Sequence, residues 1–187
     1  MSPSLIILVA VGVAVVWLVL VYNGLIRLRN RVQEAWSDID VQLKRRHDLI
    51  PNLVNSVKGY LKHERELLEK ITEYRSQAIS AQQAGDTAKL AQTEGLLGNL
   101  LGNLRVAVEA YPDLKANTTV TQLMDELSDT ENKIMAARRF YNSQVRDFNT
   151  RIEVFPNNLV ANSLKFTKYE FFEVEDKAER ENVQVQL

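Results

Sequence analysis

Two histidines, His47 and His63, are the first residues to test for chemistry, since imidazole serves both as metal ligand and as general base. A helix hairpin with its turn midway between them would bring them together. Carboxylates from Asp48, Glu64 or Glu66 would then add metal ligands. The stretch has no HExxH or EExxH pattern, however, and histidines beside charged residues near helix ends usually cap the helix or contact water. We predict the solvated or capping role, with a metal site as the minor alternative.

Other active-site motifs are absent from the sequence. The chain has no cysteine, which excludes disulfides, thiol catalysis and thiolate metal ligands. No serine lies in a GxSxG elbow, and there is no phosphate-binding or dinucleotide-binding glycine motif. We therefore predict a protein that is not an enzyme and takes no cofactor. The net charge of −1 provides no basic field, so no nucleic-acid partner is predicted.

Three glycines, Gly95, Gly98 and Gly102, alternate with leucines in the segment TEGLLGNLLGNL. At spacings of three and four they would line one side of a helix, where each costs about 0.8–1 kcal/mol relative to alanine. They would permit close approach of another backbone. The prediction is helix packing, within the bundle or between protomers in self-association, and a flexible hinge is the alternative.

The residues before these candidate sites predict a membrane anchor. Leu5–Val21 carries no charge, and with its uncharged neighbours the run reaches the roughly 20 residues that span a bilayer core. A cleaved signal peptide is the competing interpretation. It is disfavoured because no Lys or Arg precedes the run and no small-x-small cleavage site follows it. Residues 1–24 are therefore predicted to form a single transmembrane anchor.

Three arginines, Arg27, Arg29 and Arg31, follow the apolar run directly. The positive-inside rule then places the amino terminus outside and the remaining chain in the cytoplasm. These arginines are candidate contacts for anionic lipid head groups, at about 1 kcal/mol per charge. The later cluster 44–46 would lie about 25–30 Å from the membrane, where a solvated face or salt bridges between helices are expected.

Apolar residues recur every three or four positions after the anchor, which predicts amphipathic helices. The first should break or kink at Ile50, because a proline follows. The others are expected over 51–83, 88–110 and from 117–119 to about 155, with Gly85 as a helix exit followed by a cap at Asp86 or Thr87. Short connections favour antiparallel neighbours. The predicted fold is all-α: a transmembrane helix continuing into an up-and-down four-helix bundle, residues 25–155.

Two predicted turns are candidate surfaces for partners. One contains Asp48 and Pro51, and the other contains Tyr111 and Pro112. Both should lie far from the bilayer if the first helix leaves the membrane directly, whereas the segment around Phe155 should lie nearer to it. Other membrane proteins are the expected partners at these turns.

The carboxyl-terminal region, residues 156–187, differs in composition from the helices. Four of the twelve Phe and Tyr residues fall within the short segment 166–172. That density predicts docking of an irregular aromatic tail onto the bundle or onto a partner. The final dozen residues are acidic and poor in apolar side chains, which predicts a solvated or flexible end.

Several blocks of the chain together resemble the LemA family. They are the apolar first helix, residues 22–60, AYPDLKAN at 110–117, ENKIMAARRFYNSQVRDFNTRIEVFP at 131–156 and FFE at 171–173. One departure is Lys165, where family members often have glycine. The resemblance implies a single membrane helix with a short extracytoplasmic amino terminus and a cytoplasmic helical bundle. It supplies no reaction. The family is also similar to MamQ-type proteins of magnetosome membranes, which implies a theme of membrane organisation.

Two functions follow as hypotheses. The first is a membrane-anchored scaffold that contacts lipids, associates with further copies of itself and organises a membrane. The second is a regulatory or adaptor subunit of another membrane protein, such as a protease or a signalling system. An enzymatic role at His47 and His63 is the third and least supported hypothesis.

Overall fold

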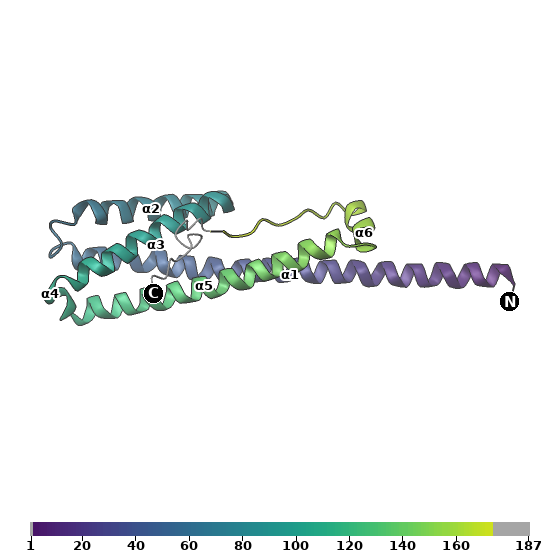
Figure 1. The fold of residues 1–187 in the computed structure, drawn as a ribbon, viewed down its shortest axis with the longest axis horizontal. Helices are drawn as coiled ribbons and strands as arrows, with labels where there is room; N and C mark the ends of the chain where they lie inside the picture. The colour runs from purple at the N-terminus through teal and green to yellow at the C-terminus, as the bar shows by residue number, and fades with distance from the viewer. Residues whose placement is uncertain (1, 174–187) are drawn as a thin grey trace, which may run out of the picture. The chain divides into compact units, whose positions relative to one another are not determined.

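The computed structural model describes residues 2–173, and the regular structure in that range is entirely helical (Figure 1). The predicted all-α class is confirmed. The helices are α1 (Pro3–Val57), α2 (Arg65–Ala84), α3 (Thr87–Glu109), α4 (Pro112–Lys115), α5 (Thr118–Glu153) and α6 (Asn157–Ser163). The predicted flexible end, the final dozen residues, lies outside the described residues.

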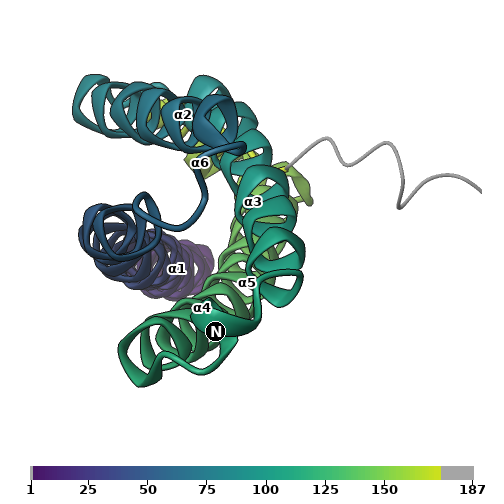
Figure 2. The ribbon, with the colours of Figure 1, turned by 90° about the vertical axis from the view of Figure 1, so that its left-hand side faces the viewer.

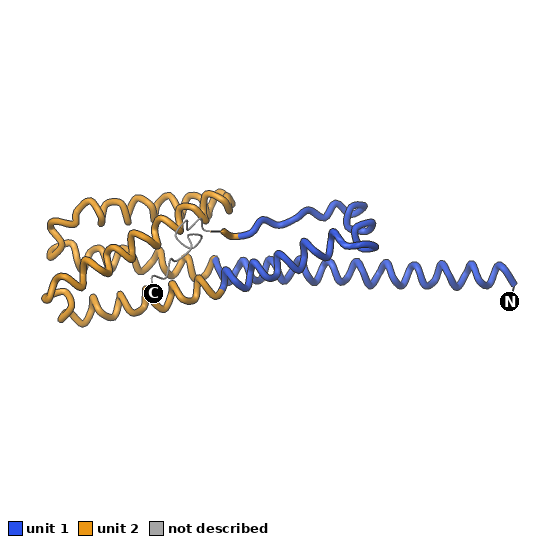
Figure 3. Tube along the Cα trace, in the orientation of Figure 1, with its two compact units in different colours: residues 1–39, 137–171 blue, residues 40–136, 172–187 orange. Residues whose placement is uncertain are grey.

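The described residues form two compact units (Figure 3). Unit 1 contains residues 2–39 and 137–171, and unit 2 contains residues 40–136 with 172 and 173. Helices α1 and α5 contribute to both units. Helices α2, α3 and α4 belong to unit 2, and α6 belongs to unit 1.

Helix α1 continues through Pro51, so the predicted break at Ile50 is wrong. The second helix begins at Arg65 rather than at Pro51, and the connection between the two helices is 58–64. Proline has no N–H to donate to the carbonyl four residues earlier, which is that of His47. Arg75 of α2 replaces this donor, with its Nε 2.6 Å from the His47 carbonyl oxygen. The helix therefore passes Pro51 without leaving that carbonyl unpaired.

The other helix ends follow local sequence signals. Helix α2 ends at Gly85, whose φ of +69° lies in the left-handed region that favours glycine. Asp86 caps α3 by accepting a hydrogen bond from the Lys89 N–H at 2.9 Å. Asn117 caps α5 by accepting from the N–H groups of residues 119 and 120. These predicted boundaries are confirmed, whereas the short helices α4 and α6 were not predicted.

Unit 2 is a four-helix arrangement in which the end of α1, α2, α3 and the start of α5 surround one core (Figure 2). Its core side chains come from the apolar stripes of these helices. They include Ile50, Leu53 and Val57 of α1, Leu68 and Ile71 of α2, Leu97, Leu101, Leu104 and Val108 of α3, and Val120 and Leu127 of α5. The predicted bundle packing is thus present in this unit.

Unit 1 pairs α1 with the second half of α5 and covers the pair with the tail. Trp36 and Tyr141 pack edge to face with ring centroids 5.3 Å apart. Phe148 packs against both Phe166 and Tyr169 of the tail. The Asn149 side chain makes two hydrogen bonds to the backbone of the tail. Its Nδ2 donates to the Tyr169 carbonyl oxygen at 2.9 Å, and its Oδ1 accepts from the Tyr169 N–H at 3.0 Å.

Among the described residues, α1 is the one helix that contains a segment long and apolar enough to cross a membrane, and this segment lies near its amino terminus. From Leu5 to Leu20 its Leu, Ile and Val side chains are exposed in the chain by itself, and Trp17 is half-buried. Burial begins at Val21 and Leu25. This apolar surface suggests membrane anchoring.

Candidate interaction surfaces and a buried polar network

A network of charged side chains lies inside unit 2, and we refer to Arg46, His47, Arg75, Glu94 and Glu131 as the Arg46 network. Its centre is an ion pair between the Arg46 guanidinium and the Glu94 carboxylate, both only 3% exposed. Arg46 Nη1 also donates to Glu131 Oε1 at 2.6 Å. With Arg75 donating to the His47 carbonyl, the network joins α1, α2, α3 and α5.

His47 is the buried imidazole of this network. Its Nε2 lies 2.6 Å from Glu94 Oε1, and the residue is 3% exposed. Burial, followed by the nearby guanidiniums of Arg46 and Arg75, lowers its pKa to about 4. Near neutral pH the ring is therefore uncharged, and Nε2–H donates to the carboxylate. Chemically, His47 is a fixed hydrogen-bond donor rather than a solvent-exposed base.

The prediction that His47 caps a helix end or contacts water is wrong. Because α1 does not end at Pro51, the segment Arg45–Asp48 is mid-helix, and two of its side chains face the core. A sequence signal for this existed. Each network charge occupies a position within an apolar stripe: Arg46 between Leu43 and Ile50, Glu94 between Leu90 and Leu97, and Glu131 between Leu127 and Ile134. Charges at core positions of three helices indicate mutual pairing.

The structure does not bring the two histidines into one site. His63 is exposed in the connection 58–64, whereas His47 is buried in α1. No group of three or more potential metal-ligating side chains occurs among residues 2–173. In the cluster 44–46, two residues form the predicted salt bridges between helices: Arg46 with Glu94 and Glu131, and Arg45 with Glu126 at 3.8 Å on the surface. Lys44 is exposed.

A small groove with a volume of about 190 Å³ lies between α3 and α5. Two of the predicted glycines, Gly98 and Gly102, line it together with Leu101, Met124 and Glu131. A Cβ built on Gly102 meets no atom within 4 Å, and one on Gly98 lies 4.0 Å from Arg46 Nη1. No neighbour within the described chain therefore requires glycine at residue 102. Glu131 places the edge of the Arg46 network in the same groove.

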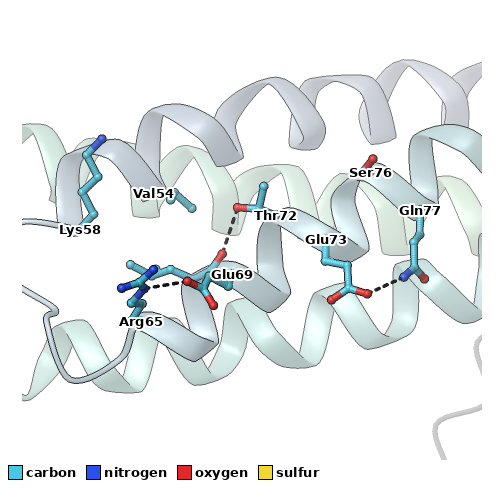
Figure 4. Close-up of a pocket in the computed structure, with 9 residues that line it drawn as sticks. Val54, Lys58, Arg65, Glu69, Thr72, Glu73, Ser76 and Gln77 are labelled. Atoms are coloured by element: carbon cyan, nitrogen blue, oxygen red, sulfur yellow. Dashed lines mark hydrogen bonds and ion pairs between the residues drawn. The ribbon is translucent and has the colours of Figure 1, made fainter.

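A larger groove of about 630 Å³ runs between the end of α1 and α2 (Figure 4). Its apolar part comes from Val54 and Leu68. Polar and charged side chains form the rest: Lys58, Arg65, Glu69, Thr72, Glu73, Ser76 and Gln77. Arg65 pairs with Glu69 at 2.7 Å, and Gln77 donates to Glu73 at 3.0 Å, so the α2 side of the groove carries ordered polar pairs.

The remaining candidate residues lie in different settings. Asp48 is exposed and Pro51 half-buried within α1, so they do not form a turn as predicted, because Arg75 allows the helix to continue. Tyr111 and Pro112 do mark a turn, where proline suits the first turn of α4. Among the three arginines after the apolar run, Arg29 lies over the Phe166 ring at 5.9 Å, and Arg27 Nε donates to a carbonyl of its own helix at 3.3 Å.

Comparison with known proteins identifies related sequences. The sequence model of the LemA family matches residues 35–187. Protein LemA of Metamycoplasma hominis is 33% identical over 154 residues, covering 82% of this chain and 69% of that protein. Magnetosome protein MamQ 2 of Paramagnetospirillum magneticum is 24% identical over 175 residues, and MamQ of Magnetospirillum gryphiswaldense is 24% identical over 174 residues. Each MamQ match covers 81% of this chain and 64% of the relative.

Proposed function

Because the chain belongs to the LemA family, we propose that it is a membrane-anchored scaffold that self-associates through the groove between α3 and α5. The apolar part of α1 holds it in a bacterial inner membrane, with the amino terminus outside and the helices that follow the apolar run on the cytoplasmic side. Arg27, Arg29 and Arg31 support this orientation by the positive-inside rule. Relatives named as magnetosome proteins favour a role in membrane organisation.

The observation that carries this proposal is the open space over Gly102. A glycine inside a helix costs about 0.8–1 kcal/mol relative to alanine, and no neighbour in the described chain requires it. Beside it, Met124 and Leu101 supply apolar surface, and Glu131 supplies a partly exposed charge. A side chain from a second copy would fill this space. Tethering to one membrane raises the local concentration of copies, so a small contact is sufficient.

The test is to fill the groove without disturbing the fold. Gly102→Leu places a side chain where a Cβ has no neighbour within 4 Å. Full-length chains carrying donor or acceptor labels are mixed in lipid vesicles at graded protein-to-lipid ratios. Energy transfer between Gly102→Leu chains should be lower than between parent chains and should equal that of randomly mixed chains. Ser76→Leu, an exposed change in the other groove, should leave it unchanged. A parent chain that shows only random mixing, or a Gly102→Leu chain that associates like the parent, would refute self-association through this groove.

A second candidate function, that of an adaptor, is favoured by the groove between α1 and α2. Its volume of about 630 Å³ and its mixture of apolar floor and paired charges fit an amphipathic helix of another membrane protein. For this function, Ser76→Trp should abolish capture of co-purified membrane proteins by the full-length chain, while Gly102→Leu should not. Equal capture by both variants and the parent would count against this function.

A further inference from the structure

Outside the apolar part of α1, exposed apolar side chains gather where α5 meets α6 in unit 1. We call Val154, Phe155, Leu159 and Leu164 the α5–α6 corner. Phe155 is 78% exposed and Leu159 is 60% exposed. Single exposed apolar residues are common on proteins, but four within eleven consecutive positions form a patch. We therefore interpret the patch as an interaction surface.

The rest of α6 is fixed by burial on its opposite side. Asn157, Val160 and Ala161 are buried, so the short helix is held against unit 1 by these residues. Leu159 takes no part in that burial. The tail that follows is also fixed, since Phe166 packs on Phe148 with ring centroids 6.2 Å apart. The corner is thus a positioned surface.

Contacts within unit 1 show the level of α1 at which the corner lies. Trp36 of α1 packs against Tyr141 of α5. Arg29 lies seven residues before Trp36 in α1, and Phe148 lies seven residues after Tyr141 in α5. Both contact Phe166. The two helices therefore run antiparallel in register. One further step of seven, about two turns, brings Tyr22 level with Phe155.

Tyr22 is the first residue after the continuous apolar segment Leu5–Val21. It is where a membrane-spanning α1 would leave the hydrocarbon core. Phe155 therefore lies at the depth of the boundary between head groups and acyl chains, a region where aromatic side chains are favoured. Figure 3 agrees with this level: beyond the α6 end of unit 1, α1 continues alone toward the amino terminus.

The charges around the corner agree with this location. Arg151 precedes it and Lys165 follows it, both exposed, and the Glu153 carboxylate at its edge is paired with Lys168. Arg27 of α1 is level with residue 150 by the same register. Cations around an apolar patch are the arrangement that binds the interface of a membrane with anionic lipids.

We propose that the α5–α6 corner inserts its apolar side chains into the interface of the bilayer that α1 crosses, as a second membrane contact of unit 1. The proposal rests on the membrane anchoring stated under Proposed function. The occupant of the patch is lipid rather than a second copy of the chain, because the register places the corner level with the end of the apolar run of α1 and exposed cations flank it. Three exposed cations, at residues 27, 151 and 165, then face anionic head groups.

The absence of cysteine makes a site-specific test direct. Phe155→Cys and Leu159→Cys in the full-length chain each accept one environment-sensitive fluorophore. Phe140→Cys is the matched control, since Phe140 is an exposed apolar residue of α5 in the same unit, about 22 Å from the corner along the helix. The chains are reconstituted into vesicles of equal parts phosphatidylethanolamine and phosphatidylglycerol.

Relative to a label exposed to water, labels at 155 and 159 should emit at shorter wavelength. They should be quenched by nitroxide-bearing lipids and protected from quenching by aqueous iodide. The label at 140 should keep its iodide quenching. If the vesicles float with the chain bound but all three labels are equally accessible to iodide, the corner does not insert. If the chain fails to float with vesicles, membrane anchoring itself fails. Protection that disappears in nanodiscs holding one chain would show that a second copy, not lipid, covers the corner.

Discussion

At the scale of single residues, the Arg46 network combines groups that are costly to bury with partners that offset the cost. A buried ion pair contributes little net stability relative to apolar packing, but removing one partner leaves a charge without compensation. Arg46 is balanced by Glu94 and Glu131, which lie on two other helices. The network therefore fixes which helices of unit 2 are neighbours.

His47 gives unit 2 a stability that depends on pH. Its pKa of about 4 in the folded chain lies below its ordinary value near 6.5. As the pH falls through this window, the unfolded chain takes up a proton that the folded chain does not, so stability is lost by up to about 3 kcal/mol. Above pH 6.5 His47 is uncharged in both the folded and the unfolded chain, so it adds nothing to the pH dependence of stability. Urea unfolding of the full-length chain in mild detergent, followed by circular dichroism at several pH values, measures this loss.

The matched pair of variants for that measurement is His47→Gln and His63→Gln. Glutamine at 47 keeps a donor toward Glu94 but does not titrate, so the extra loss between pH 6.5 and 4 should disappear. His63 is exposed, and its substitution should leave the pH profile unchanged. If the His47→Gln chain loses stability with pH as steeply as the parent, His47 is not a buried neutral imidazole.

The Arg75–His47 contact leads to a prediction for Pro51. Arg75→Ala leaves the His47 carbonyl unpaired, which should cost about 1–3 kcal/mol of unfolding free energy. Pro51→Ala restores a backbone N–H in reach of that carbonyl. In the Pro51→Ala chain the cost of Arg75→Ala should therefore fall by about 1 kcal/mol or more. Chemical denaturation of the four chains of this cycle measures the coupling, and simple additivity would contradict it.

At the scale of elements, two glycines in different settings, one inside a helix and one at a helix end, should respond in opposite ways to alanine. Gly102 lies inside α3 with open space at its Cβ, so Gly102→Ala should raise stability by about 0.8–1 kcal/mol. Gly85 ends α2 with a φ of +69°, so Gly85→Ala should lower it by about 1–2 kcal/mol. Thermal and urea unfolding of both variants measures the difference. A destabilised Gly102→Ala chain would mean that the space is occupied.

At the scale of the whole molecule, the arginines after the apolar run should decide orientation. Changing Arg27, Arg29 and Arg31 to Gln while introducing Ser2→Lys and Ser4→Lys reverses the charge bias across the run. A large fraction of chains should then insert in the opposite sense. A membrane-impermeant thiol reagent applied to intact cells reads the orientation from a single cysteine at an exposed site.

Met135→Cys provides that site, since Met135 is an exposed residue of α5. In the parent background it should react only after the membrane is permeabilised, and in the charge-reversed chain it should react without permeabilisation. Removing three exposed cations far from the run, with Arg65→Gln, Lys70→Gln and Arg105→Gln, should not change its reactivity. Reaction of the parent cysteine in intact cells would refute the proposed orientation.

Local sequence patterns predicted a large part of the fold. The period of apolar residues identified the all-α class, and the uncharged run identified the one helix suited to a membrane. Gly85, Asp86 and Asn117 marked helix ends correctly, because a cap depends on a residue's own backbone and on N–H groups two or three positions away. Such signals are complete within a few consecutive residues.

The continuation of α1 through Pro51 and the burial of His47 depended on distant partners instead. The Arg75 donor lies 28 positions from His47, Glu94 lies 47 positions from it, and Glu131 lies 85 positions from Arg46. By itself the sequence determined the helical class, the apolar run, the helix caps and the family resemblance, because each is written in contiguous residues. Only the tertiary structure decided that α1 continues through Pro51 and that Arg46 and His47 are buried inside unit 2. Groups on other helices supply the missing hydrogen-bond donor and the balancing charges.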